Sequence, residues 1–169
     1  MMKVEIHEDP SDFDAVVQSL KDLGHKQVKV GLPSKAGGQL RFILAVQTHG
    51  SPVMRIPARP VVEPALASSQ VREEMASAMV EAVEAAWNGD EGGAQAGLEA
   101  AGKAGADGIR AYIDSGSLAP NAPVTVSGGW IWNRVARKGV YVSGKGSNTP
   151  LIDTGGLYNA FDFEVSSTL

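Results

Sequence analysis

The sequence predicts an α+β fold: a small β-sheet with two long helices packed on it, plus a long loop-rich insertion before the C-terminal strand. Three short segments alternate apolar and polar residues, as strands do: 3–7, 28–32 and 161–165. Apolar residues recur every three or four positions, as in helices, over two long central segments: 64–87 and 93–114. Glycines and prolines interrupt residues 116–149, which is typical of loops.

Length and composition fit one globular domain, residues 1–169. Hydrophobic residues make up 43% and charged residues 20%, which argues against wholesale disorder. No window approaches the ~18–20 apolar residues of a membrane span, and the charged N-terminus predicts no secretory signal. Cysteine is absent, which excludes disulfides and thiol catalysis. The net charge of −4 argues against a globally basic nucleic-acid binder.

The first elements are a strand at 3–7, a helix and a second strand at 28–32. Ser11 and Asp14 have the spacing of a helix start, and Gly24 is a helix stop. The apolar stripe of this helix comprises Phe13, Val16, Val17, Leu20 and Leu23. The order strand–helix–strand is compatible with a parallel crossover or with a looser arrangement.

A short helix is expected at 40–49, ended by Gly50. The segment 51–60 contains three prolines, which make it stiff and extended. Pro64 fits the first turn of the helix that follows.

The two central helices have different surfaces. The inward face expected for the first comprises Leu66, Val71, Met75, Met79, Ala82, Val83 and Ala86. The second carries four interior glycines: Gly97, Gly102, Gly105 and Gly108. Each costs about 1 kcal/mol relative to Ala in a helix, and close packing against a neighbouring helix explains them better than a functional hinge.

After the second long helix, short strands are expected at 124–126 and 140–142. The C-terminal part is compact: a helical turn through Leu157 and Tyr158, then the final strand at 161–165.

Charge is distributed unevenly along the chain. Eight acidic residues and Arg72 alone lie between Glu63 and Glu99. The segment from Ser115 to Ile152 holds no acid and four cations: Arg134, Arg137, Lys138 and Lys145. Each run by itself is best explained as a solvated surface. Together, an acidic helix and a basic loop could also face each other between identical subunits.

Two sequence motifs suggest chemistry and are discounted. Asp153-Thr-Gly155 matches the motif of retroviral-type aspartic proteases, yet only 14 residues follow it, so a turn capped by Asp153 or Thr154 is favoured. The segment 139–145 matches G-x-x-x-x-G-K, but Gly146 replaces the required Ser or Thr.

No metal or cofactor is predicted, because the three histidines lack partners at ligand spacing. Trp130 and Trp132 stand near the basic residues, which suits a docking loop or a weak nucleic-acid contact.

Two islands carry a resemblance to a known family. The first is I-P-A-R-P-V-V-E-P-A-L at 56–66, and the second is P-L-I-D-T-G-G-L-Y-N-A-F at 150–161. With the early strand Val28-Lys-Val30-Gly31, in this order and separated by two helices, the chain resembles the tailed-bacteriophage neck and tail-completion proteins, the minor head–tail connector or virion morphogenesis group.

That resemblance implies a structural virion protein without enzymatic activity. It would form a ring of six or twelve copies at the head–tail junction, assembled in the host cytoplasm. Its neighbours would be head-completion or connector proteins and tail-tube proteins. DNA would pass the lumen without specific binding, and no membrane would be involved. The alternatives are a dimeric aspartic protease built on Asp153 and a small nucleic-acid-binding accessory protein.

Residue roles follow from the islands and the basic loop. Structural or interface roles are expected for Arg59, Pro60, Pro64, Leu151, Ile152, Asp153, Thr154, Gly155 and Leu157. We expect Arg59 and Asp153 in particular to be structural anchors, with Arg59 holding the stiff proline segment. A docking loop is expected at Trp130, Trp132, Arg134, Arg137 and Lys138.

Overall fold

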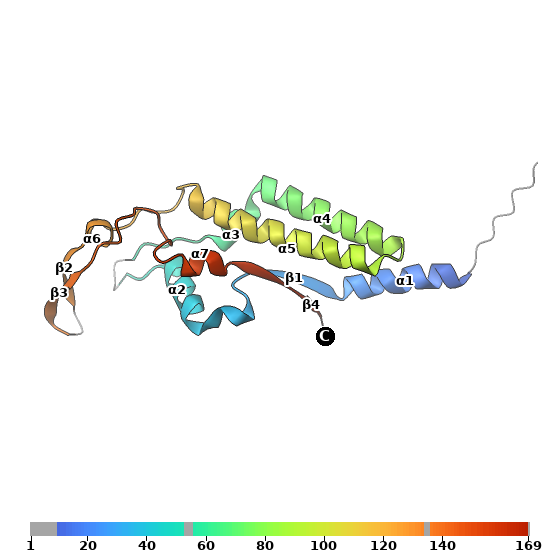
Figure 1. Cartoon of the computed structure of the whole chain (residues 1–169), viewed down its shortest axis with the longest axis horizontal. Coiled ribbons are helices and arrows are strands. Elements are labelled where there is room, and N and C mark those ends of the chain that lie inside the picture. The colour runs from blue at the N-terminus through green and yellow to red at the C-terminus, as the bar shows by residue number, and fades with distance from the viewer. Residues whose placement is uncertain (1–9, 53–55, 134–135, 169) are drawn as a thin grey trace, which may run out of the picture.

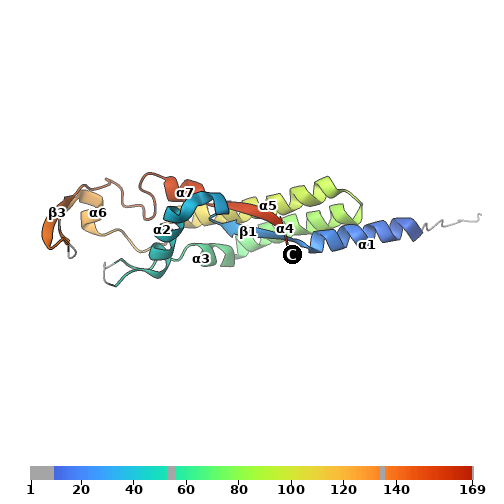
Figure 2. The same cartoon turned by 90° about the horizontal axis from the view of Figure 1, so that it is seen from below.

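The computed structural model describes residues 10–52, 56–133 and 136–168. Its centre is a pair of antiparallel helices, α4 (Ser69–Trp87) and α5 (Glu91–Asp114), beside a two-stranded sheet. The molecule is elongated: α1 (Pro10–Gly24) extends from one end and a small β-hairpin lies at the other (Figures 1 and 2). The predicted α+β class is confirmed, with 58% helix and 16% strand.

The central sheet joins two segments that are far apart in the sequence. Strand β1 (Lys26–Gly31) pairs antiparallel with β4 (Asp162–Ser167), in a register that places Lys26 opposite Ser167. Helix α5 packs on both strands. The predicted strand at 3–7 lies outside the described residues, and β1 has no parallel partner among the residues that are described.

The glycines of α5 are sites of close packing, as predicted. A Cβ at Gly97 would lie 2.7 Å from the Ala82 Cβ on α4, and one at Gly108 would lie 2.6 Å from Val71. Gly102 lies against Phe163 of β4, so the glycines of α5 allow close packing against the sheet as well as against α4.

The predicted helix 64–87 is two helices. Helix α3 (Val62–Ala67) ends before Ser68, whose extended backbone separates it from α4. Pro64 lies in the first turn of α3, where its missing N–H costs no helical hydrogen bond.

The predicted inward face of α4 is partly wrong. Met79 and Val83 are 42% and 48% exposed, whereas the buried residues of this helix are Val71, Ala78, Ala82 and Ala86. Because α5 presents glycines, the two backbones approach closely and small side chains fill the interface. The larger apolar side chains are left on the outer surface.

The two sequence islands share one core. Val61 and Ala65 from the first island pack in the same buried cluster as Leu157 and Phe161 from the second. The last turns of α5 complete this cluster with Ile109 and Ile113, and Leu118 joins from the segment that follows.

The remaining elements flank this body. They are η1 (Ser34–Ala36), α2 (Gly37–His49), α6 (Pro123–Ser127), β2 (Gly129–Asn133), β3 (Lys138–Val142) and α7 (Gly156–Ala160). The prediction of a strand at 124–126 is wrong, because α6 occupies it; the strand at 140–142 is confirmed as part of β3. No helix in the described ranges has the length and hydropathy needed to cross a membrane.

Candidate functional site

The segment 116–149, here called the arm, contains α6 and a hairpin formed by β2 and β3. The strands are antiparallel, with Trp130 opposite Tyr141. Their rings meet edge to face, with centroids 5.7 Å apart. Trp130 and Trp132 are 75% and 67% exposed, and Tyr141 is also exposed. An exposed surface with this many aromatic side chains is unusual for a monomer and typical of a binding surface.

The hairpin has two different faces because side chains alternate along a strand. Trp130 and Trp132 share one face, and Tyr141 joins them from the paired strand. Ile131 and Val142 belong to the opposite face and line a cavity toward the body of the protein. The aromatic face is therefore the one left without an intramolecular partner among the described residues.

Positive charge lies at the tip of this hairpin. Arg137 and Lys138 are exposed, and Arg137 has a left-handed backbone with φ of 49°. The ion pairs of the described residues include neither cation. Arg134, the third predicted docking cation, lies outside the described residues.

Arg59 connects the base of the arm to the body. Its side chain is 6% exposed. Nε and Nη2 donate to the carbonyl oxygens of Ala119 and Pro120 at 2.7 and 2.8 Å, and Nη1 donates to Gln47 Oε1 at 2.9 Å. Burial lowers the pKa of the Arg59 guanidinium. These contacts support the predicted anchoring role, and they join α2, the proline segment and the arm.

A second basic residue holds the other end of the arm. Lys145 Nζ donates to the carbonyl oxygen of Ile152 at 2.6 Å and to that of Thr149. Burial lowers the pKa of Lys145, and the nearby carboxylate of Asp153 opposes this shift. Since no helix begins until Gly156, this lysine does not sit in a phosphate-binding loop that leads into a helix.

The second island is held by backbone geometry and by burial. Leu151 and Gly155 have positive φ, 62° and 79°. Leu157 is buried, and both Leu151 and Ile152 pack against the core cluster. In the first island, Pro60 is exposed directly after the buried Arg59.

Asp153 and Thr154 differ in what they contact. The hydroxyl of Thr154 accepts a hydrogen bond from the Gly156 N–H at 3.4 Å. Asp153 is exposed and makes no hydrogen bond with any described residue, so only Thr154 of the two predicted capping residues bonds to this turn. The N-cap of α7 itself is Gly155, which has no side chain to cap it. An anchoring role for Asp153 would have to act through its charge near Lys145.

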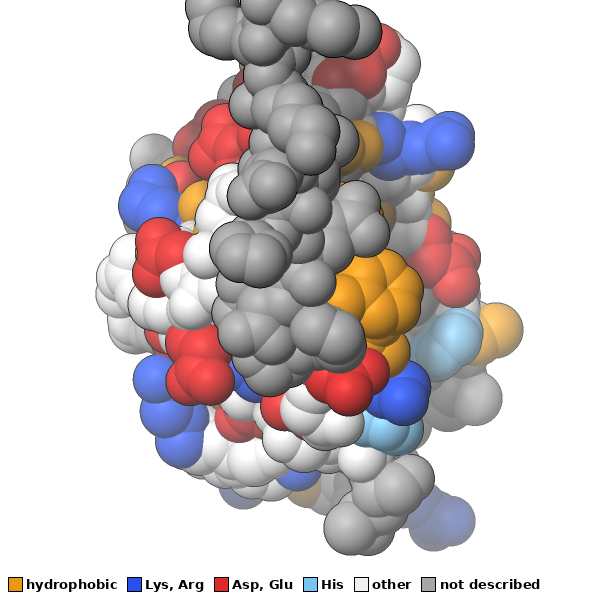
Figure 3. Space-filling view, turned by 90° about the vertical axis from the view of Figure 1, so that its right-hand side faces the viewer, with side chains coloured by type: hydrophobic (Ala, Val, Ile, Leu, Met, Phe, Trp, Pro, Cys, Tyr) orange, Lys and Arg blue, Asp and Glu red, His pale blue; other side chains and the backbone are white. Residues whose placement is uncertain are grey.

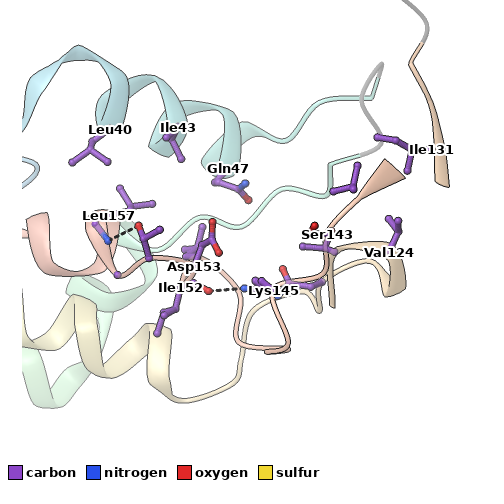
Figure 4. Close-up of a pocket in the computed structure, with 17 residues that line it drawn as sticks. Leu40, Ile43, Gln47, Val124, Ile131, Ser143, Lys145, Ile152, Asp153 and Leu157 are labelled. Atoms are coloured by element: carbon purple, nitrogen blue, oxygen red, sulfur yellow. Dashed lines mark hydrogen bonds between the residues drawn. The ribbon is translucent and has the colours of Figure 1, made fainter. Parts of the chain in front are cut away.

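A cavity of about 530 Å³ lies between α2, the hairpin and the second island. Leu40, Ile43 and Gln47 project from α2, and Val124 and Ile131 lie across from them (Figure 4). The charged side chains that line it are Lys145 and Asp153. Among the described residues that line the cavity, Asp153 is the only carboxylate, so a protease dyad would require Asp153 of another copy.

The sequence did not predict the apolar stripe on the outer surface of α4, because Met79 and Val83 were expected to face inward. Met79, Val80, Val83 and Trp87 are 42–59% exposed and lie on one face of the helix. Two carboxylates, Glu73 and Glu84, lie along one edge of this stripe. The signal was available in the small residues: Ala78, Ala82 and Ala86 match the glycines of α5 and mark the buried face.

No known family model matches the sequence, and no curated protein or solved structure is detectably similar to it.

Proposed function

We propose that the protein is a structural subunit of a virion, a neck or tail-completion protein that assembles into a ring at the junction of a phage head and its tail. Its work is contact between copies and with neighbouring rings, and it catalyses no reaction. The observation that carries the proposal is the exposed aromatic hairpin, which is held on the body by the buried Arg59.

Two further observations support it. The islands that carry the family resemblance pack into one core, through Val61 and Leu157 among others, so they form one structural unit. The molecule also carries large apolar side chains on two separate surfaces, the hairpin and α4. A subunit of a closed ring needs two different patches, one for each neighbour.

The proposal places the protein in the virion after assembly in the host cytoplasm, as a ring of six or twelve copies. Its neighbours are the head-completion or connector ring and the tail-tube proteins. DNA passes through the lumen without specific contacts, which agrees with the net charge of −4.

The test is the state of assembly of the purified chain. Native mass spectrometry and two-dimensional image averages over a range of concentrations should show closed rings. The protein should also be found at the neck of particles of the virus that encodes it. A chain that stays monomeric at every concentration and is missing from particles would overturn the proposal.

The nucleic-acid alternative makes a different prediction from the same hairpin. If the two tryptophans and two cations bind single strands, the affinity should fall steeply with salt. Titration of a fluorescent oligonucleotide at two salt concentrations distinguishes the two functions.

A further inference from the structure

We infer that the aromatic hairpin of one copy docks on the outer face of α4 in the next copy. This inference rests on the proposed function, since it names the two surfaces that would build the ring. It follows from the chemistry of the two surfaces and from their positions in the molecule.

The receiving surface is the apolar stripe on α4. At 100° per residue, Met79, Val80, Val83 and Trp87 fall within an arc of about 100°. All four are more than two-fifths exposed. No other described element covers them, although α1 packs near the end of the helix, where a shallow groove runs between Val16 and Trp87.

Carboxylates follow the same stripe along one edge. Glu73 and Glu84 lie next to Val80 around the helix, about 20° and 40° beyond it. The ion pairs formed among the described residues involve neither of these two carboxylates. Figure 3 shows the molecule from the end at which α1 extends from the body. Acidic side chains are spread over this surface, and hydrophobic side chains are exposed beside them.

The hairpin has the complementary properties. Trp130, Trp132 and Tyr141 give an exposed aromatic face, and Arg137 and Lys138 place positive charge at its tip. The aromatic rings would cover the apolar stripe while the cations approach the carboxylates at its edge. Charge complementarity of this kind fixes the register of an interface.

Within one chain the two surfaces cannot meet. The hairpin lies at one end of the long axis, and Trp87 lies at the opposite end of the body, where α4 ends beside α1 (Figures 1 and 2). The contact must therefore join two copies. It is heterologous, because one patch differs from the other, and its repetition builds a ring where the rotation between neighbouring copies closes.

The area also indicates how strong the contact is. Three aromatic side chains bury about 150–250 Å² each. Their sum falls below the ~800 Å² that each partner contributes to a standard interface. A single contact is therefore weak, and assembly should depend steeply on concentration until the ring closes.

Cysteine cross-linking tests the contact directly, because the chain has no cysteine of its own. Val83→Cys chains mixed with Trp132→Cys chains should form a disulfide-linked dimer under mild oxidation. The chain carrying both substitutions should give a ladder of covalent oligomers. The control pairs Trp132→Cys with Ala111→Cys, an exposed position on α5, and should not cross-link above background.

Charge exchange tests the register. Reversal of the hairpin charges, Arg137→Glu with Lys138→Glu, should weaken assembly by about tenfold or more, and so should Glu73→Lys with Glu84→Lys. Mixing the two variants should restore assembly, because the charges are complementary again. Lys29→Glu and Glu99→Lys, exposed positions on β1 and α5, serve as controls that should assemble normally.

The outcomes separate this inference from the proposed function. If the unmodified chain forms rings but the cysteine pair stays unlinked and the charge variants assemble normally, the inference is wrong and the proposed function stands. Rings that form normally but no longer join a neighbouring ring would show that the hairpin binds another protein, which also overturns the inference. A chain that never assembles overturns both.

Discussion

Replacement of Arg59 by alanine removes the side chain that joins the arm to the body. Three acceptors lose their donor: the carbonyls of Ala119 and Pro120 and the side-chain oxygen of Gln47. Arg59 as a whole residue is 6% exposed, so solvent screens these bonds little. A hydrogen bond to a charged group contributes about 1.5–3 kcal/mol, and burial of the charge offsets part of this. Because Pro120 is itself exposed and water can replace its donor, we expect a net loss of about 2–4 kcal/mol.

The assay is urea unfolding followed by two signals. Circular dichroism reports the helices, and tryptophan fluorescence is weighted toward the arm, which carries two of the three tryptophans. Arg59→Ala should lower the midpoint and separate the two transitions, because the arm loses its attachment before the body unfolds. Arg59→Lys keeps the charge but loses the planar guanidinium, so its urea midpoint should lie between those of Arg59→Ala and the unmodified chain.

The matched control is Arg72→Ala, an exposed arginine on α4 without an ion pair among the described residues. It should change the free energy of unfolding by less than about 0.5 kcal/mol. If Arg59→Ala behaved like this control, with coincident transitions and an unchanged midpoint, the anchoring argument would be refuted.

Three other predictions concern packing and pH. Gly97→Ala should destabilise the chain by about 1–3 kcal/mol in urea unfolding, because the added Cβ meets the backbone of Ala82 at 2.8 Å. The control Gly38→Ala, with open space around it, should be neutral or stabilising. Equal effects of the two substitutions would contradict the close packing of α5 on α4. Lys35 donates a hydrogen bond to Asp162 and lowers the pKa of this carboxyl group. The ionised Asp162 should therefore stabilise the fold above about pH 4, and this stabilisation should be lost as the pH falls through the lowered pKa. In Lys35→Met, the urea midpoint should depend less on pH in the acid range. The hydrogen bond to Asp114 raises the pKa of Tyr158. The stabilisation from this hydrogen bond should therefore be fully present below about pH 10 and be lost as the pH rises through the raised pKa. If Tyr158→Phe loses stability over the same pH range, another group is responsible.

If copies assemble as we propose, the joint between arm and body matters for that assembly as well as for stability. Arg59 and Lys145 hold its two ends through backbone carbonyls, so the arm is attached without depending on the identity of the side chains along it. The hairpin can therefore present tryptophans and cations to a partner while its base stays fixed. A binding surface on a firmly held base loses less conformational entropy on docking.

The anchoring position of Arg59, an arginine between prolines, could be predicted from sequence. Trp130 and Trp132 with the neighbouring cations indicated a docking segment; the structure shows these tryptophans exposed, and their docking role stays a prediction. The acceptors of Arg59 could not be predicted, because Ala119 and Pro120 are some sixty positions away and carbonyl oxygens carry no sequence signal. The outward position of Met79 and Val83 could not be predicted either, because it depends on how closely α5 approaches α4.

The sequence alone determined which segments become helices and strands wherever a period and a stop residue agree. Residues 28–32, 40–49, 93–114 and the C-terminal strand lie where their patterns predict them, because backbone geometry sets those periods. The tertiary structure decided the rest. It pairs Lys26 with Ser167 across nearly the whole chain, breaks the helix at Ser68 and makes a helix of 123–127. A periodic pattern of apolar residues indicates that a helix has an apolar face, but the neighbouring element decides which residues are buried. For α4 this neighbour is α5, whose glycines allow such close approach that small side chains fill the interface and the larger ones stay exposed.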